Sequence, residues 1–137
     1  MANFEYKVNP PQKGNRNSKN VLLLLSLSEP VVWEQYEGRV PEDATTYEIA
    51  NSEQQQQLNW LVAEDQLEKF GKVYQEMLST IQRVHGQDAV IYVLAAVPTA
   101  VAIEVGRLHR PNAHSQLEIY NCVGGVFSPA LTLRKPQ

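Results

Sequence analysis

Two long apolar runs dominate the pattern of hydrophobic and polar positions: residues 21–27 (VLLLLSL) and residues 90–96 (VIYVLAA). Neither run alternates between apolar and polar side chains, which is typical of a central strand covered on both faces, as in a parallel sheet. Residues 117–123 (LEIYNCV) predict a third core strand, and residues 45–49 (TTYEI) predict a short additional one. The pattern therefore predicts a sheet with layers packed on both of its faces.

The two ends of the chain predict peripheral strands. Residues 4–8 alternate, which suits a short strand or an extended arm, and residues 9–20 predict a loop or linker because they are rich in Pro, Asn, Gly and Lys. Near the other end, Gly124-Gly125 predicts a hairpin turn that leads into a last strand at residues 126–133. Pro129 cannot donate a ladder hydrogen bond, so it places this last strand at the sheet edge.

The clearest helix is predicted over residues 66–84. Asp65 with Glu68 fits a capping box at its start, and Gly86 fits its C-terminal stop. The apolar residues recur at spacings of three and four and form one stripe. These residues are Leu67, Phe70, Tyr74, Met77, Leu78, Ile81 and Val84.

A second helix is predicted over about residues 100–109, because Pro111 ends the helical pattern. The elements then follow the order β-β-α-β-α-β-β. This order predicts an α/β fold with three layers, a Rossmann-like, mostly parallel sheet and a C-terminal antiparallel edge hairpin.

Composition narrows the class of protein. The chain has 137 residues, which suits one domain, and its net charge of −3 argues against a long nucleic-acid partner or an acidic membrane surface. A small phosphorylated ligand stays possible, because a few backbone N–H groups can hold it. One cysteine, no secretory signal and no apolar run long enough to span a bilayer predict a soluble, cytoplasmic protein without a membrane partner.

Candidate chemistry gathers where the predicted strands end, since open α/β sheets bind ligands beyond the carboxyl ends of their strands. Three segments qualify: residues 26–30 (SLSEP), 96–100 (AVPTA) and 121–125 (NCVGG). Thr99 suits a helix N-cap whose free N–H groups face an anion, and Ala100 lets the helix approach the sheet closely. On spacing alone, however, ordinary helix capping explains these two residues more simply.

Other candidates each have a structural alternative. Ser26 and Ser28 could donate to a phosphate or a base edge, or could equally satisfy backbone groups at the strand end. Trp33 could stack on a base, although a lone tryptophan in an apolar loop more often belongs to a core or an interface.

Evidence for catalysis or a metal is thin. The three histidines, His85, His109 and His114, lack metal-ligand spacing, and Cys122 falls in a predicted buried strand. His85 and His109 are placed at helix C-termini, where a partial positive charge is favourable. The basic cluster Lys13, Arg16 and Lys19 precedes the first core strand, on the side opposite the expected site. We therefore predict no catalytic residue, no metal and no cofactor.

In the second half of the chain an apolar strand is followed by PxxxAxExGR at residues 98–107, then by Pro111, then by an L-x-hydrophobic-Tyr pattern at residues 117–120 and F-x-P-A-L at residues 127–131. These motifs closely resemble the C-terminal portion of SAVED domains. Upstream, residues 21–30 (VLLLLSLSEP) and the helix carrying Phe70 are also similar. The resemblance covers roughly residues 21–133.

This resemblance implies a fold and a function. SAVED domains are sensors of cyclic oligonucleotide second messengers in bacterial antiviral systems of the CBASS and type III CRISPR kinds. They consist of two fused CARF-like halves, usually carry an effector, and bind the ligand across the carboxyl ends of the strands. The resemblance implies an N-terminal arm or linker at residues 1–20 and one CARF-like half at residues 21–137. The chain would then be a separated half, a fragment, or one that pairs with another chain.

From the resemblance and the strand ends together we expect a binding module for a cyclic tri- or tetranucleotide. It would signal by ligand-driven assembly, as a homo-oligomer or with a second SAVED half or effector chain. The alternatives are a structural dimerisation half-domain without a ligand, and a ring nuclease, against which the lack of a general-base histidine near the loops counts. The expected ligand contacts are Ser26, Leu27, Ser28, Glu29, Trp33, Pro98, Thr99 and Ala100.

Overall fold

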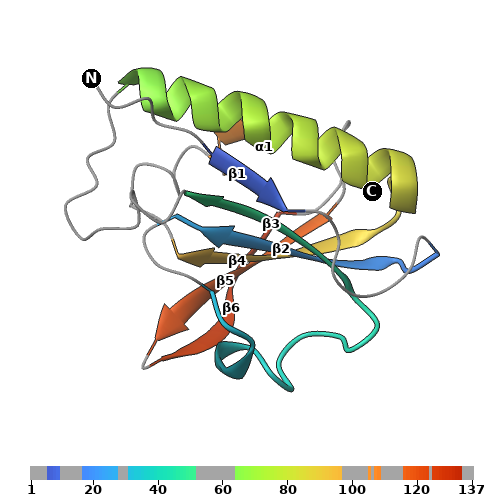
Figure 1. Cartoon of the computed structure of the whole chain (residues 1–137). Helices are drawn as coiled ribbons and strands as arrows, with labels where there is room; N and C mark the ends of the chain where they lie inside the picture. The colour runs from blue at the N-terminus through green and yellow to red at the C-terminus, as the bar shows by residue number, and fades with distance from the viewer. Residues whose placement is uncertain are drawn as a thin grey trace.

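The computed structural model describes residues 6–9, 17–27, 31–51, 64–96, 105, 107–108, 116–123 and 125–133. Figure 1 shows one sheet with the long helix lying over it. The elements are β1 (Tyr6–Asn9), β2 (Asn20–Ser26), the 3-10 helix η1 (Trp33–Gln35), β3 (Thr45–Asn51), α1 (Glu64–His85), β4 (Val90–Ala96), β5 (Gln116–Val123) and β6 (Val126–Leu133). No helix among these described residues is long and apolar enough to cross a membrane.

The six strands form one mixed sheet in the order β1-β3-β2-β4-β5-β6. The four inner strands, β3, β2, β4 and β5, run parallel, while β1 and β6 pair antiparallel at the two edges. The two longest apolar runs of the sequence are thus the two central strands. The predicted Rossmann-like, mostly parallel sheet with an antiparallel edge hairpin is confirmed.

The N-terminal alternation forms a strand rather than a free arm. β1 pairs with β3 in an antiparallel register that begins at Tyr6 opposite Asn51 and ends at Asn9 opposite Glu48. The sheet therefore has an antiparallel edge at both sides, one more than the sequence predicts, because the pairing partner of β1 lies some forty residues away along the chain. The division between an arm and a half-domain at residue 20 stays a prediction.

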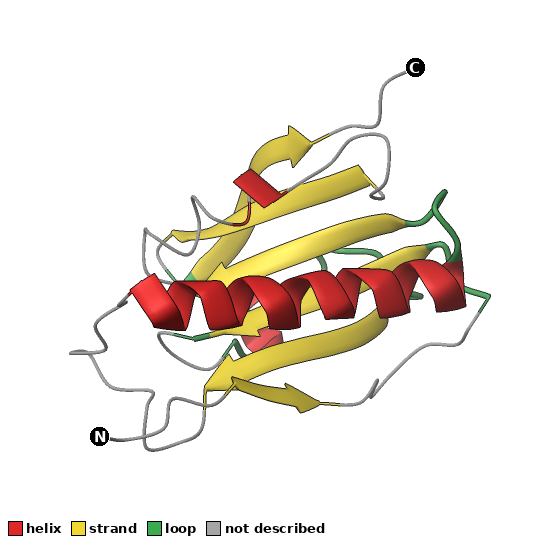
Figure 2. Cartoon of the chain, turned by 90° about the horizontal axis from the view of Figure 1, so that it is seen from above, coloured by secondary structure: helices red, strands yellow, loops and turns green. Residues whose placement is uncertain are grey.

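Helix α1 covers one face of the sheet, as Figure 2 shows from above. It begins two residues before the predicted start and ends one residue after the predicted end. The described members of its apolar stripe from Phe70 to Ile81 are buried against the odd-numbered positions of β2, such as Leu23 and Leu25. At the C-terminus the amide of Gly86, at φ +90°, donates to the carbonyl of Gln82 over 2.9 Å, as a C-terminal glycine stop requires.

The predicted second helix is described only in part. Val105, Arg107 and Leu108 are helical, and the rest of residues 100–109 lies outside the described residues. Val105 is buried in the same core cluster as α1, and Leu108 packs against that cluster. These residues therefore belong to the α1 side of the sheet.

The opposite face is covered by the connection between β2 and β3. We call residues 31–44 the η1 loop, because they contain η1. Its residues Val31 and Ala44 are buried with Leu22 and Leu24 of β2, with Tyr36 and Val40 packed against them. Leu22 and Leu24 therefore face the η1 loop, which covers them, just as α1 covers the odd-numbered positions of β2.

The β5–β6 hairpin continues past the last residue pair between β4 and β5, which is Leu94 with Tyr120. Pro129 lies on the edge strand, as predicted, beside a β-bulge at which Ile119 pairs with Leu131 and Tyr120 with Pro129. Cys122, in contrast, is only half-buried, where the sequence predicts a buried strand. The reason is that β4 pairs with β5 only as far as Tyr120, so Cys122 has a neighbouring strand on one side alone.

Candidate functional site at the carboxyl edge of the sheet

The carboxyl ends of the central strands lie side by side. Ser26, the last residue of β2, pairs with Ala96, the last residue of β4, and with Ala50 of β3. The amide of Leu27 donates to the carbonyl oxygen of Ala96 over 3.0 Å, so this pairing continues one residue past β2. Figure 1 shows that α1 begins at this same edge. The segments that follow β2 and β4 therefore leave the sheet from adjacent positions.

Ser26 joins three segments with one hydroxyl group. Its Oγ donates to Glu48 Oε2 over 2.8 Å and accepts the amide hydrogen of Val31 over 3.1 Å. The Ser26 side chain is 1% exposed. In this geometry the hydroxyl links the start of the η1 loop to β3. The sequence allows Ser26 either to contact a ligand or to satisfy backbone groups at the strand end, and the bond to the Val31 amide is of the second kind. Contact between Ser26 and a ligand stays a prediction.

The other expected contacts separate into two groups. The Leu27 side chain is fully buried in the core on the α1 side, so a ligand would meet the backbone of Leu27 rather than its side chain. The remaining edge contacts stay predictions, because they lie outside the described residues. They are Ser28, Glu29, Pro98, Thr99 and Ala100.

Trp33 lies on the η1 loop and is 52% exposed. It lines a pocket of about 220 Å³ together with Leu22 and Thr46 of the sheet and with η1-loop residues between Tyr36 and Ala44. We call this hollow the η1 pocket. Neither Ser26 nor Leu27 lines it. Contact between Trp33 and a ligand stays a prediction.

Glu48 is the neighbour of the site that sequence reasoning missed. The sequence predicts Glu48 only as part of a short strand, yet its half-buried carboxylate accepts a hydrogen bond from the Ser26 hydroxyl. Burial raises the pKa of Tyr36 above its ordinary range, and the carboxylates of Glu48 and then Glu34 raise it further. The alternation of residues 45–49 (TTYEI) does indicate the position of Glu48, since it places Thr46 and Glu48 on the face opposite Tyr47 and Ile49.

The amino edge of the sheet, at the other end, has a structural network. Lys19 Nζ donates to the carbonyl of His85 over 2.7 Å and forms an exposed ion pair with Asp88 at 3.1 Å. Lys19 therefore lies at the edge opposite the carboxyl ends of the strands, whereas Lys13 and Arg16 lie outside the described residues. His85 is buried at the end of α1, where it serves as a hydrogen-bond junction.

Within the described ranges no three His, Cys, Asp or Glu side chains gather as metal ligands would. His109 and His114 lie outside those ranges. The chemistry that the described edge offers is hydrogen bonding, through backbone groups and the Ser26–Glu48 pair.

Fold and edge together define a Rossmann-like α/β protein whose central strands end side by side at one edge of the sheet. The family described as "SMODS-associated and fused to various effectors sensor domain", SAVED, matches residues 2–133. The chain belongs to the SAVED family. Among curated protein sequences, none matches the chain.

Solved structures agree in fold. The Acinetobacter baumannii Cap4 SAVED/CARF-domain containing receptor with the cyclic trinucleotide 2′3′3′-cAAA superposes with a TM-score of 0.72 at 11% identity, over 98% of this chain and 28% of that chain. The same receptor with 3′3′3′-cAAA gives a TM-score of 0.71 at 11% identity, over 91% of this chain and 27% of that one. This chain therefore spans little more than a quarter of the length of Cap4.

Replacing Ser26 with alanine is expected to lower the free energy of unfolding by about 2 kcal/mol, because it leaves the buried Val31 amide without its acceptor. Urea unfolding measures the loss, and hydrogen exchange at Val31 should accelerate with it. Ser79→Ala on the exposed side of α1 is the matched control and should change stability by less than about 0.5 kcal/mol. Equal stability of the Ser26 and Ser79 variants would contradict the structural role of this hydroxyl.

Proposed function

We propose that this chain is a binding module that senses a cyclic oligonucleotide second messenger in the cytoplasm, as part of bacterial antiviral defence. The observation that carries the proposal is the convergence of β2 and β4 at Ser26 and Ala96, in a chain that belongs to a sensor-domain family. The Cap4 structures, which hold cyclic trinucleotides, support the ligand class.

The ligand is a cyclic tri- or tetranucleotide that lies over the carboxyl edge. The serine-bearing segment after β2 and the N–H groups at residues 99–101 after β4 hold its phosphates or bases. Ser26 does not need to touch the ligand. Its hydrogen bonds to Glu48 and Val31 position the two ends of the segment that carries Ser28 and Glu29. No cofactor takes part.

Signalling occurs through assembly. A second copy of this chain, a second SAVED half or an effector chain contributes the rest of the site. A ligand that contacts two partners at once favours the assembled form by its differential affinity for it.

Calorimetry and size-exclusion chromatography with a panel of cyclic tri- and tetranucleotides, and with linear triadenylate as the control ligand, test this function. We expect binding of at least one cyclic member together with a shift to a larger species. Failure of every member to bind would overturn the sensor function and favour a structural half-domain. Linearised product in the chromatographed ligand would instead support a ring nuclease.

The location of the site is tested by Ser28→Trp and Thr99→Trp, with Ser79→Trp on the exposed side of α1 as the matched control. The two edge variants should weaken binding by at least about ten-fold, because a bulky side chain displaces the ligand from the strand ends. The control should bind as the unchanged protein does. Circular dichroism verifies that each variant folds, and undiminished affinity in both edge variants would place the site elsewhere.

A further inference from the structure

The η1 loop is held in place at its start, its middle and its end. Ser26 Oγ accepts the Val31 amide at the start, the Tyr120 hydroxyl donates to the Arg39 carbonyl over 3.1 Å in the middle, and the Ser18 hydroxyl donates to the Asp43 carbonyl over 2.9 Å at the end. Tyr36 and Val40 add apolar packing against the sheet. The η1 pocket is therefore a preformed hollow with little conformational entropy left to lose on binding.

This well-anchored loop nevertheless exposes its largest apolar side chain. Trp33 is 52% exposed and its neighbour Val32 is 44% exposed, and these are the exposed large hydrophobic residues of the described structure. A tryptophan at the mouth of a preformed pocket, beside a second apolar residue, is typical of a recognition surface, where aromatic anchors contribute most of the binding energy.

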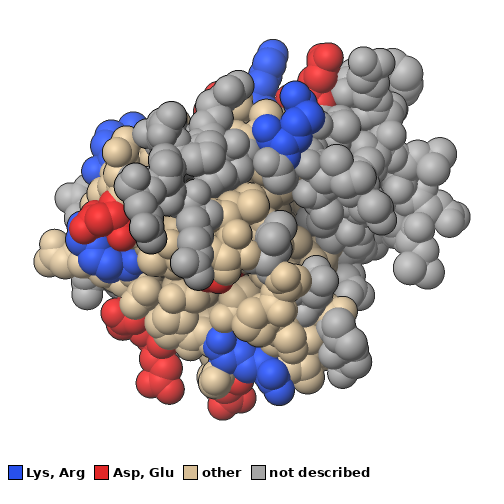
Figure 3. Space-filling model, turned by 180° about the vertical axis from the view of Figure 1, so that it is seen from behind, with Lys and Arg blue, Asp and Glu red and all other residues tan. Residues whose placement is uncertain are grey.

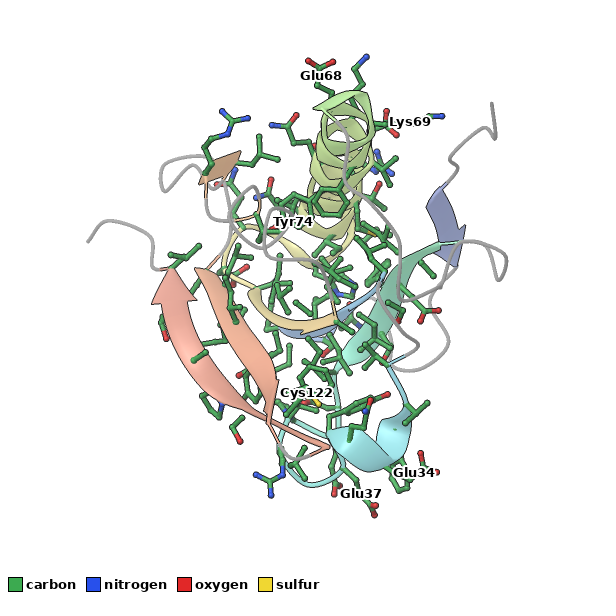
Figure 4. All side chains as sticks on the ribbon, turned by 90° about the vertical axis from the view of Figure 1, so that its left-hand side faces the viewer. Glu34, Glu37, Glu68, Lys69, Tyr74 and Cys122 are labelled. Carbon is green, nitrogen blue, oxygen red and sulfur yellow. The ribbon has the colours of Figure 1, made fainter. Side chains whose placement is uncertain are left out.

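The charge of the loop indicates what kind of group binds there. Residues 31–44 contain four acidic side chains and one basic one, so they account for a net charge equal to the −3 of the whole chain. Glu37 and Glu42 line the η1 pocket itself, whereas Arg39 does not. Figure 4 shows Glu34 and Glu37 projecting from the η1 end, away from the sheet. Figure 3 shows acidic side chains along the lower rim of the molecule, with basic side chains beside them.

We propose that the η1 pocket docks a basic segment of a partner protein, which inserts an arginine or lysine beside Trp33 with an apolar neighbour packed on Val32. The indole face attracts the cation, Glu37 and Glu42 neutralise it, and Leu22 and Val40 contact its aliphatic stem. The same carboxylates repel phosphate, which separates this surface from the proposed nucleotide edge. The proposal does not depend on nucleotide binding.

The experiment uses the full chain without any nucleotide and a synthetic hexapeptide amide of alternating leucine and arginine. Its control is the same peptide with citrulline, the neutral isostere of arginine, at each arginine position. Binding is followed by NMR at the indole N–H signals, and Trp33→Phe identifies the Trp33 signal. We expect the arginine peptide to shift that signal and the citrulline peptide to bind at least about five-fold more weakly, as loss of cation–π and ionic contacts predicts.

Two variants test the contacts. Trp33→Ala and the double change Glu37→Gln with Glu42→Gln should each lower the affinity for the arginine peptide by about five-fold or more. The double change should also reduce the salt dependence of binding. Glu68→Gln with Glu76→Gln on the exposed side of α1 removes the same charge and should bind normally. Equal affinity for both peptides, or full affinity in Trp33→Ala, would overturn the proposal. The proposal would also be overturned if the protein dimerised without peptide and Trp33→Ala abolished the dimer. That result would show that a second copy of the chain binds this surface.

Discussion

Replacing Tyr74 with phenylalanine is expected to stabilise the protein, by about 1 kcal/mol at neutral pH. Tyr74 is fully buried in α1 and stacks on Phe70 with ring centroids 5.6 Å apart. Within the described structure its hydroxyl is the buried side-chain group that has no hydrogen-bond partner. Phenylalanine keeps the stacked ring and removes the cost of burying that hydroxyl away from water.

The gain should increase in alkaline solution. Burial raises the pKa of Tyr74 far above its ordinary value, so the folded protein holds this proton more tightly than the unfolded chain does. Below about pH 10 Tyr74 is neutral in both the folded and the unfolded state, so its ionisation does not affect stability. Above about pH 10 the free energy of unfolding falls by up to about 1.4 kcal/mol for each pH unit, because only the unfolded state ionises easily. Burial also raises the pKa of Tyr92 and Tyr120, but these residues are common to both proteins and cancel in the comparison.

Urea unfolding of both proteins between about pH 7 and about pH 11 measures the two effects. Tyr47→Phe is the matched control, because the Tyr47 ring is also buried but its hydroxyl lies 2.8 Å from His85 Nε2. The same chemical change should there destabilise the protein by about 1 kcal/mol. A Tyr74→Phe variant destabilised as much as Tyr47→Phe would show that the Tyr74 hydroxyl has a partner after all.

Replacing His85 with alanine is expected to lower the free energy of unfolding by about 3 kcal/mol, from a cavity and two broken hydrogen bonds. Nδ1 lies 2.9 Å from the Ser18 carbonyl oxygen, which can only accept, so Nδ1 carries a hydrogen. In the neutral ring Nε2 then accepts the hydroxyl hydrogen of Tyr47. His85 thereby joins the end of α1 to β3 and to the segment before β2.

Thermal and urea unfolding of His85→Ala, of Tyr47→Phe and of the double variant form a cycle that isolates the coupling between the two side chains. We expect the double variant to lose less stability than the sum of the single losses, because the shared hydrogen bond is removed once. Arg83→Ala, in the same last turn but exposed, should cost less than about 0.5 kcal/mol. Strict additivity would show that the two side chains do not interact in solution.

Much of the architecture could be predicted from the sequence because its signals are local. The apolar run at residues 21–27 predicts a strand buried on both faces, whichever segments cover it. The apolar stripe from Phe70 to Ile81 predicts which side of α1 packs on the sheet. Pro129 predicts an edge strand from the chemistry of one residue. The sequence could not decide whether residues 4–8 form an arm or a strand, because that depends on pairing with Asn51 and its neighbours.

The candidate site depended more on residues that are distant in the sequence. The sequence by itself determined the parallel core and therefore the edge at which Ser26 and Ala96 meet, because continuous apolar runs and short punctuated connections restrict the topology. Only the tertiary structure decided where the Ser26 hydroxyl points, since its partner Glu48 belongs to another strand. It likewise decided that Trp33 lies on an exposed pocket, because the packing of the η1 loop on the sheet, rather than any local pattern, determines which of its side chains are left in solvent.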